Sequence, residues 1–294
     1  MITASKHLAA GLLLTGIASA IQAAPVASWG YVTSAEFITA TAQYSAGGGT
    51  QTTSTSILSW GDSGGNFTSP TGNRSALTIG SGTTGADRYN GLAVNDGGTL
   101  VQTVMSGNPI LPANIGGGPT FTHFNNPISG DFATLLRSSV TDSLTLFPNV
   151  PFPGGGPNVP LPTLTFNFEF RETVNAGPCA GGTATPCGDL FGFSGTPTTD
   201  IAFNYLGEDY FASILVLGPN GQASPIGTLL AAECNALGLL AGCQGWRTNE
   251  EQVTTIQFGF LVSAVPQFVP EPASLALIGL GLFGLGLGRR AQKR

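Results

Sequence analysis

Two segments of the chain alternate between apolar and polar residues, and this pattern restricts the fold more than any other feature of the sequence. In Leu164–Arg171 every second residue is leucine or phenylalanine, and the residues between them are polar. The segment Thr254–Val262 repeats the alternation, with Ile, Phe, Phe and Val on one side. A period of two residues places the apolar side chains on one face of a strand, so both segments are predicted to be half-buried strands.

Other short segments have the composition of strands and are separated by turns rich in Gly, Pro, Asn and Ser. They are Ser28–Thr33, Glu36–Tyr44, Ser56–Trp60, Ser75–Ile79, Thr99–Met105, Ser143–Phe147, Ile201–Tyr205 and Tyr210–Leu217. One helix is expected over Thr228–Leu237, where apolar residues follow a helical spacing before Gly238. The sequence therefore predicts an all-β fold, an antiparallel β-sandwich or jelly roll with one short helix.

The stretch Pro148–Pro162 interrupts this pattern with six prolines and three consecutive glycines. Such a stretch serves either as a linker between two halves or as a long surface loop within one domain. We favour the loop because neither half contains a complete set of strands. The central part of the chain, residues 24–268, is therefore expected to form one β-rich domain.

Charge is sparse in this central part and mostly negative. No lysine occurs between Pro25 and Pro270, and the whole chain has a formal net charge of −6. The arginines of this part are Arg74, Arg88, Arg137, Arg171 and Arg247. No binding to nucleic acid is expected, because neutralising phosphates requires clustered basic residues.

Four cysteines occur in two close pairs, and in an exported protein an even number predicts disulfides. Three pairings are open. Local closure, Cys179–Cys187 and Cys234–Cys243, is favoured because each pair encloses a short glycine-rich loop. A zinc site is the alternative, but the spacings exceed the usual two to four residues and no histidine lies near either pair.

The N-terminus has the features of a secretory signal peptide, assigned to residues 1–23. Lys6 and His7 precede an uncharged run from Leu8 to Ala20, and small residues follow at the expected cleavage region. The central domain is therefore expected to be exported.

The C-terminus combines a short polar motif, an apolar run and a basic tail. The motif is Val269-Pro270-Glu271-Pro272, the expected transmembrane helix covers residues 273–288, and the tail is 289–294. A helix of this length spans about 24 Å, somewhat less than a bilayer core. Basic residues that would stay on the cytoplasmic side are Arg289, Arg290, Lys293 and Arg294. A permanent tail anchor is the alternative to a temporary one.

This tripartite tail resembles the PEP-CTERM sorting signal. The resemblance implies recognition and processing by an exosortase, a transpeptidase-like membrane enzyme. It further implies a Gram-negative bacterium, export through the Sec translocon, cleavage by signal peptidase and transient anchoring in the inner membrane. The end point would be the cell surface or an extracellular matrix, where polysaccharide is a candidate partner.

A second resemblance lies within the central domain. The segment Thr122-His123-Phe124-Asn125 resembles the Thr-His-x-Asn motif of the THxN family of PEP-CTERM proteins, and Leu58–Gly61 and Phe168–Thr173 support it. The resemblance implies Thr122, His123 and Asn125 as motif residues, but no biochemical activity. From the residues alone, His123 is expected to have a structural role, pinning a loop between strands. Asn125 and Asn126 would close a turn before Pro127.

No set of catalytic residues is complete. Gly61-Asp62-Ser63-Gly64-Gly65 matches the nucleophile segment of trypsin-like proteases, but His123 is the only histidine of the central domain and follows Ser63 instead of preceding it. This pentapeptide is therefore expected to be a turn. Neither a catalytic residue nor a metal ligand is assigned.

We expect an exported, non-catalytic surface or matrix protein without a cofactor. One alternative is a carbohydrate- or calcium-binding module, with aromatic residues as a sugar platform or acidic loops as calcium ligands. The acidic residues are Asp62, Asp87, Asp96, Glu208, Asp209, Glu250 and Glu251, and the aromatic ones Trp29, Tyr31, Trp60, Tyr89, Tyr205, Tyr210 and Trp246. The other is a hydrolase that uses His123 with a serine, oriented by Asp131 or Glu172.

Overall fold

The computed structural model describes residues 25–68, 72–80, 100–150, 157–173, 179, 187–194, 200–217, 223–224 and 227–267. The expected signal peptide, transmembrane helix and basic tail lie outside these residues, as do Asp87, Tyr89 and Asp96. Within the described ranges, no helix has the length and apolar character needed to cross a bilayer.

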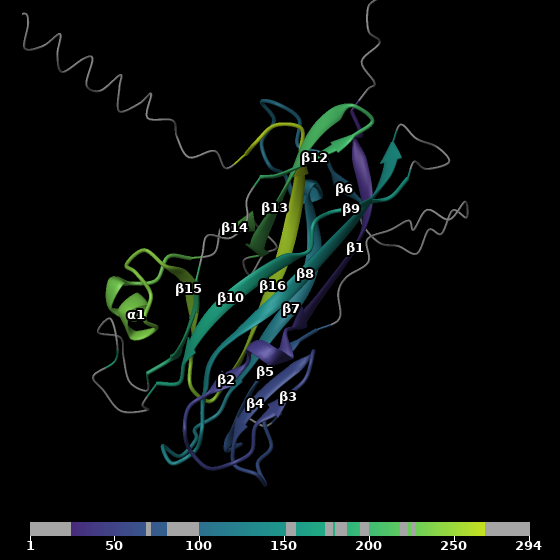
Figure 1. The fold of residues 1–294 in the computed structure, drawn as a ribbon. Helices are drawn as coiled ribbons and strands as arrows, with labels where there is room; N and C mark the ends of the chain where they lie inside the picture. Colours follow the sequence, from purple (N-terminus) through teal and green to yellow (C-terminus); the bar gives the residue numbers. More distant parts are fainter. Residues whose placement is uncertain are drawn as a thin grey trace, which may run out of the picture.

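Two antiparallel sheets pack face to face (Figure 1). The first has the strand order β15-β11-β10-β8-β1-β6, and β2 and β9 pair with β8. Its strands are β1 (Ser28–Phe37), β2 (Gln43–Tyr44), β6 (Val101–Gln102), β8 (Leu135–Val150), β9 (Val159–Pro160), β10 (Leu164–Arg171), β11 (Asp189–Phe193) and β15 (Gln244–Thr248).

The second sheet has the order β12-β13-β16-β7-β5-β4-β3, and β14 pairs with β13. Its strands are β3 (Thr52–Thr53), β4 (Ile57–Gly61), β5 (Arg74–Ile79), β7 (Ile115–Asn125), β12 (Ile201–Tyr205), β13 (Glu208–Leu217), β14 (Ala223–Ser224) and β16 (Gln252–Ser263). The helix α1 covers Ala231–Ala236. The expected antiparallel β architecture with one short helix is thus confirmed.

The core between the sheets has two main clusters, each drawing residues from both sheets. One surrounds Trp29 of β1 and consists of Val26, Trp29, Tyr31, Val101, Leu146, Leu161, Tyr205, Tyr210, Ala212, Phe260 and Val262. The other consists of Phe37, Leu58, Trp60, Leu77, Ile79, Phe121, Leu135, Phe168, Phe170 and Phe191. Phe168 and Phe170 of β10 belong to this second cluster, as their spacing of two residues predicts.

Some expected elements differ from those observed. The strand predicted over Glu36–Tyr44 is not continuous: β1 ends at Phe37, a 3₁₀ turn, η1 (Thr39–Thr41), follows, and β2 begins at Gln43. There the Thr41 hydroxyl donates to the carbonyl of Ile38 at 2.7 Å, a local bond that competes with strand pairing. Of the predicted strand Thr99–Met105, the structure describes residues 100–105, and within these only Val101–Gln102 form a strand, β6. A second 3₁₀ turn, η2 (Pro112–Asn114), precedes β7.

Six of the observed strands were not predicted: β3, β7, β9, β11, β14 and β15. The first half of β7 is Ile-Gly-Gly-Gly-Pro, which has the composition of a turn. The structure shows why glycine is needed there, because a Cβ on Gly116 would overlap the ring of Phe260. That ring packs edge-on against Tyr31 of the opposite sheet, with centroids 4.7 Å apart. The glycine therefore makes room for packing between the sheets.

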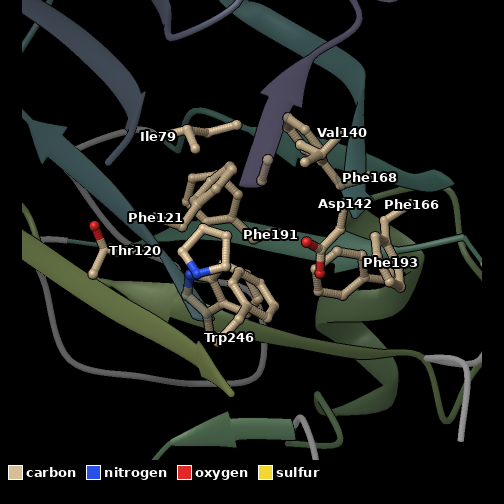
Figure 2. Close-up of a pocket in the computed structure, with 13 residues that line it drawn as sticks. Ile79, Thr120, Phe121, Val140, Asp142, Phe166, Phe168, Phe191, Phe193 and Trp246 are labelled. Atoms are coloured by element: carbon tan, nitrogen blue, oxygen red, sulfur yellow. The ribbon is translucent and has the colours of Figure 1, made fainter. Parts of the chain in front are cut away.

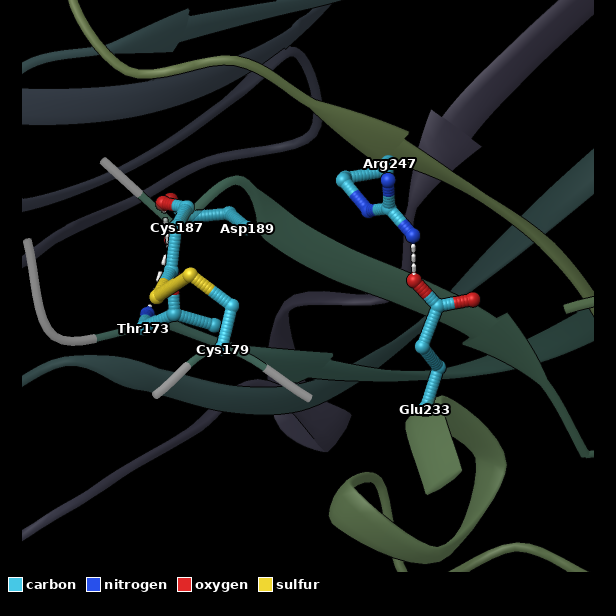
Figure 3. Close-up of a disulfide and its surroundings, with 6 residues drawn as sticks. All are labelled: Thr173, Cys179, Cys187, Asp189, Glu233 and Arg247. Carbon is cyan, nitrogen blue, oxygen red and sulfur yellow. Dashed lines mark hydrogen bonds and ion pairs between the residues drawn. A yellow bond between two sulfur atoms is a disulfide. The ribbon is translucent and has the colours of Figure 1, made fainter. Parts of the chain in front are cut away.

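Both predicted disulfides are present. Cys179–Cys187 closes the segment before β11 (Figure 3), and Cys234–Cys243 ties α1 to the start of β15. The helix begins later than expected, after Leu230, whose backbone N–H donates to the Glu233 carboxylate at 2.9 Å. Glu233 also pairs with Arg247 of β15 (Figure 3). The helix is therefore attached to β15 by one covalent link and one ion pair.

The Glu233–Arg247 pair gives a first prediction. The side chain of Glu233 is 2% exposed and that of Arg247 30%. We expect Arg247→Met to lower the free energy of unfolding by about 1–2 kcal/mol, because it leaves a buried carboxylate without its partner while water still reaches part of the site. Urea denaturation would measure this.

The matched control is Arg137→Met. The Arg137 side chain is 54% exposed and its Nε lies 3.6 Å from Glu169 Oε2. We expect a change below about 0.5 kcal/mol, because exposed pairs are weak. Equal losses in the two variants would contradict the role assigned to burial.

Candidate functional site

His123 lies within β7 and points into the sandwich. Along β7 the side chains of Phe121, His123 and Asn125 are buried, and Thr122 between them reaches Thr255 of β16 with hydroxyl oxygens 3.0 Å apart. The prediction that His123 pins a loop is therefore wrong: it belongs to a strand flanked by β5 and β16. The alternation of side chains along β7 places His123 and Asn125 on the inner face of the sheet and Thr122 on the outer face.

Aromatic rings enclose His123. Trp60 stacks on the imidazole at a centroid distance of 6.0 Å, and Phe170 and Phe191 meet it edge-on at 5.5 and 5.1 Å. Its Nδ1 lies 2.8 Å from the hydroxyl of Thr248. Burial lowers the pKa of His123 to about 3, so the ring is neutral.

Three carboxylates lie close to one another, and one of them, Asp189, lies beside this histidine, with its Oδ2 3.8 Å from His123 Nε2. Glu172 follows β10, Asp189 begins β11, and Glu250 lies in the turn between β15 and β16. Carboxylate oxygens of the three residues lie within 4.8 Å of one another. Antiparallel pairing of Arg171 with Leu190 brings Glu172 and Asp189 together across adjacent strands. We call Glu172, Asp189 and Glu250 the carboxylate cluster.

Hydrogen bonds hold two members of the cluster. Trp60 Nε1 donates to Glu172 Oε2 at 2.8 Å. The backbone N–H of Thr173 donates to Asp189 Oδ1 at 2.8 Å, and the Thr173 hydroxyl donates to the carbonyl of Cys187 at 2.8 Å (Figure 3). The Cys179–Cys187 disulfide thus supports the segment that orients Asp189.

Burial shifts all three carboxyl groups in the same direction. Desolvation raises the pKa of Glu172 to about 8 and that of Glu250 to about 7. It also raises the pKa of Asp189 well above its ordinary value, and the nearby charges of Glu172 and Glu250 raise it further. The protein alone therefore holds protons on this cluster near neutral pH.

Several buried polar atoms at this place have no hydrogen-bond partner among the described residues. They are His123 Nε2, Asn125 Oδ1, Asp189 Oδ2 and both carboxylate oxygens of Glu250. Asn125 uses its amide nitrogen to donate to the carbonyl of Thr248 at 3.4 Å. Unpartnered buried polar atoms are uncommon, so a concentration of them requires an explanation.

The protease-like pentapeptide is a turn, as expected. Asp62 Oδ1 accepts from the backbone N–H of Gly64 at 3.0 Å, and Asp62 Oδ2 accepts from Asn73 at 2.6 Å. Ser63 is exposed, whereas His123 is buried between the sheets. The two side chains therefore do not assemble into a serine–histidine pair in the described part of the chain.

The proposed sugar platform is not formed by the aromatic residues that the structure describes. Trp29, Tyr31, Trp60, Tyr205 and Tyr210 are buried in the core between the sheets. Trp246 packs at the edge of the second core cluster. These rings stabilise the fold and are not available for stacking on a ligand.

A small apolar cavity lies between the sheets (Figure 2). Its volume is about 30 Å³, room for roughly two water molecules and too little for a sugar ring. Figure 2 shows phenylalanines and Trp246 around it, with Asp142 among them. Burial raises the pKa of Asp142 to about 7. The lining residues include Ile79, Phe121, Val140, Phe166, Phe193 and Phe258.

An open hollow of about 400 Å³ lies over β8 and β10, lined mainly by polar side chains. Its polar groups already pair with one another: Ser139 donates to Asn167 at 2.6 Å, and Arg137 lies beside Glu169. The hollow therefore offers a ligand few polar groups that are not already paired.

Glu172 and Glu250 were considered separately from the sequence, and Asp189 was not considered. A signal from position was available only for Glu172, which follows the predicted strand Leu164–Arg171, because Asp189 and Glu250 adjoin the unpredicted strands β11 and β15. The relation of these residues to His123 could not be seen, since His123 was assigned to a loop.

A β-sandwich body preceding the motif, apolar run and basic tail defines an exported protein with a C-terminal sorting signal. Residues 268–291 match the family described as the PEP-CTERM protein-sorting motif. The chain thus carries this motif, which implies an exported protein processed at the membrane by an exosortase. No curated protein significantly matches the chain. The THxN resemblance stays a prediction.

Proposed function

We propose that the chain is a non-catalytic structural protein of the cell surface or extracellular matrix. Its tail delivers the β-sandwich to the exosortase, which anchors, trims or releases it. The match of residues 268–291 to the sorting motif carries this proposal. The signal peptide, residues 1–23, directs the chain into the inner membrane for export. The apolar segment 273–288 then retains the chain in that membrane.

The described body supports a non-catalytic role. Its concentrated titratable groups lie between the sheets: His123 and Asp189 are 1% and 0% exposed, and Glu250 is 5% exposed. A substrate larger than a small ion cannot reach these three side chains without separating the sheets. Catalysis requires contact between these groups and the reacting atoms.

Deleting residues 268–294 tests the sorting role. We expect the truncated protein to become soluble in the periplasm with only its signal peptide removed, because the exosortase no longer recognises it. Cell fractionation and intact-mass analysis would measure both effects. Unchanged fractionation and mass of the C-terminal end would contradict the proposal.

A matched variant separates recognition from simple anchoring. Glu271→Ala leaves the apolar run and the basic residues intact. We expect it to stay in the inner membrane unprocessed, because the hydrophobic segment still inserts while the motif is altered. Normal processing of this variant would show that the enzyme does not need Glu271.

A further inference from the structure

The carboxylate cluster lies where the two sheets meet. Glu172 and Asp189 come from the β10 and β11 side, and His123 comes from β7 of the opposite sheet. Glu250 belongs to the turn that connects the sheets. Any ligand bound to all four residues would therefore join β7 directly to β10 and β11.

Among the described residues, no basic side chain forms an ion pair with Glu172 or Glu250, and only the neutral His123 lies near Asp189. No arginine in the described ranges forms an ion pair with the cluster, since Arg247 pairs with Glu233 and Arg137 with Glu169. Three carboxylates within 4.8 Å cannot all ionise in a buried site unless a cation compensates them. They either keep protons or bind a metal ion.

The imidazole of His123 is directed toward Asp189 of the carboxylate cluster. Its Nε2 is buried, has no hydrogen-bond partner among the described residues, and lies 3.8 Å from Asp189 Oδ2. This separation is too long for a hydrogen bond. It is the separation expected for two ligands of one cation, because bonds of about 2.0–2.4 Å place neighbouring ligands about 3–4 Å apart.

The other ring nitrogen is already engaged. Nδ1 lies 2.8 Å from Thr248 Oγ1, and in the tautomer that donates Nδ1–H to this hydroxyl the lone pair is on Nε2. Histidine ligands commonly donate their second N–H in this way, which fixes the ring. In that tautomer Nε2 carries no proton, as a metal ligand requires.

We propose that Glu172, Asp189, Glu250 and His123 bind one divalent metal cation that joins the two sheets. Carboxylate oxygens suit calcium, magnesium and manganese, and imidazole suits first-row transition metals. The mixed set favours Mn²⁺ or Zn²⁺ over Ca²⁺ and Mg²⁺. The partial exposure of Glu172 provides a side from which an ion enters. This proposal stands independently of the sorting role.

The test uses the full chain, purified in detergent and treated with EDTA. Thermal melting is then followed with Mn²⁺, Zn²⁺, Ca²⁺ or Mg²⁺ added separately. We expect Mn²⁺ or Zn²⁺ to raise Tm by about 5–10 °C at roughly one hundred times Kd. Elemental analysis should find one ion per chain. Background binding is limited because all four cysteines are in disulfides and only one other histidine exists.

Asp189→Asn and Glu250→Gln are expected to abolish the rise in Tm. Each keeps the size of the side chain and removes a negative ligand, and the amide introduced by Asp189→Asn would retain an oxygen that accepts from Thr173. The matched control is Asp142→Asn, a partly buried carboxyl group outside the cluster, which should keep the full response. If either cluster variant does not fold, the other supplies the test.

His123→Gln is expected to weaken Mn²⁺ or Zn²⁺ binding at least about 10-fold. A response to Ca²⁺ alone, or an unchanged affinity in this variant, would overturn the assignment of His123 as a ligand. Absence of any rise in Tm with all four ions would overturn the site itself. So would a response that survives in Asp189→Asn and Glu250→Gln.

Discussion

Replacing Trp29 with alanine will lower the free energy of unfolding by about 3–5 kcal/mol, the range for truncating a large buried aromatic residue. Trp29 is fully buried. Its ring meets Phe203, Tyr205 and Tyr210 edge-on, with centroids 5.2–5.8 Å apart. All three partners belong to β12 and β13 of the opposite sheet, so the loss falls on contacts that hold the sheets together.

Trp29→Phe is the matched control. The phenyl ring keeps most of the packing, but it cannot donate to Thr103 as the indole Nε1 does at 2.9 Å. Thr103 Oγ1 still donates to the carbonyl of Val26. We expect a loss of about 1–2 kcal/mol. Urea denaturation followed by circular dichroism measures both variants, and a loss below about 1 kcal/mol for Trp29→Ala would contradict the assigned role.

The metal-free protein will become less stable as pH rises from about 6.5 to about 8.5. The pKa values of Glu172 and Glu250 are about 8 and 7 in the folded protein, and both groups lose their protons near pH 4 when unfolded. In this window the folded state therefore binds more protons than the unfolded state. Stability then falls as pH rises, by about 2 kcal/mol in order of magnitude.

Other groups near the cluster modify this dependence without reversing it. Asp189 shifts in the same direction, and the charge of Glu251 contributes to raising the pKa of Glu250. Asp142 contributes to the same loss from outside the cluster. His123, with a pKa lowered to about 3, adds stability as pH rises to about 6.5 and none above it. Between about pH 6.5 and 8.5 the change in stability therefore comes mainly from the carboxyl groups.

Denaturation in EDTA at several pH values measures the effect. Glu172→Gln should flatten the curve, because an amide does not titrate and the loss assigned to this group disappears. Addition of Mn²⁺ or Zn²⁺ should reverse the slope, since a metal binds the deprotonated carboxylates more tightly at higher pH. A stability that stays constant or rises over this window in EDTA would contradict the raised pKa values.

Strands with strict alternation were predicted closely. Leu164–Arg171 is β10 with both boundaries correct, and Ile201–Tyr205 is likewise β12. These strands present one face to the core, so their pattern is visible along the chain. The strand β7 was missed because its glycines serve packing against Phe260, a residue far away in the sequence.

The candidate site likewise depends on contacts between residues that are far apart in the sequence. Asp189 and Glu250 are ordinary acidic residues of short segments, and a sequence pattern cannot indicate that they meet. His123 and Thr248 are 125 residues apart. Their contact depends on β7 and β15 belonging to opposite sheets that pack together.

The sequence by itself determined the sorting motif, the cysteine pairs and the class of fold, because each of these depends on residues close together in the chain. Tertiary structure alone decided that three carboxylates and an imidazole share one buried place. Strand order and sheet packing bring these four side chains together. Among the described residues no arginine pairs with the carboxylate cluster, so a cation is left to compensate its charge.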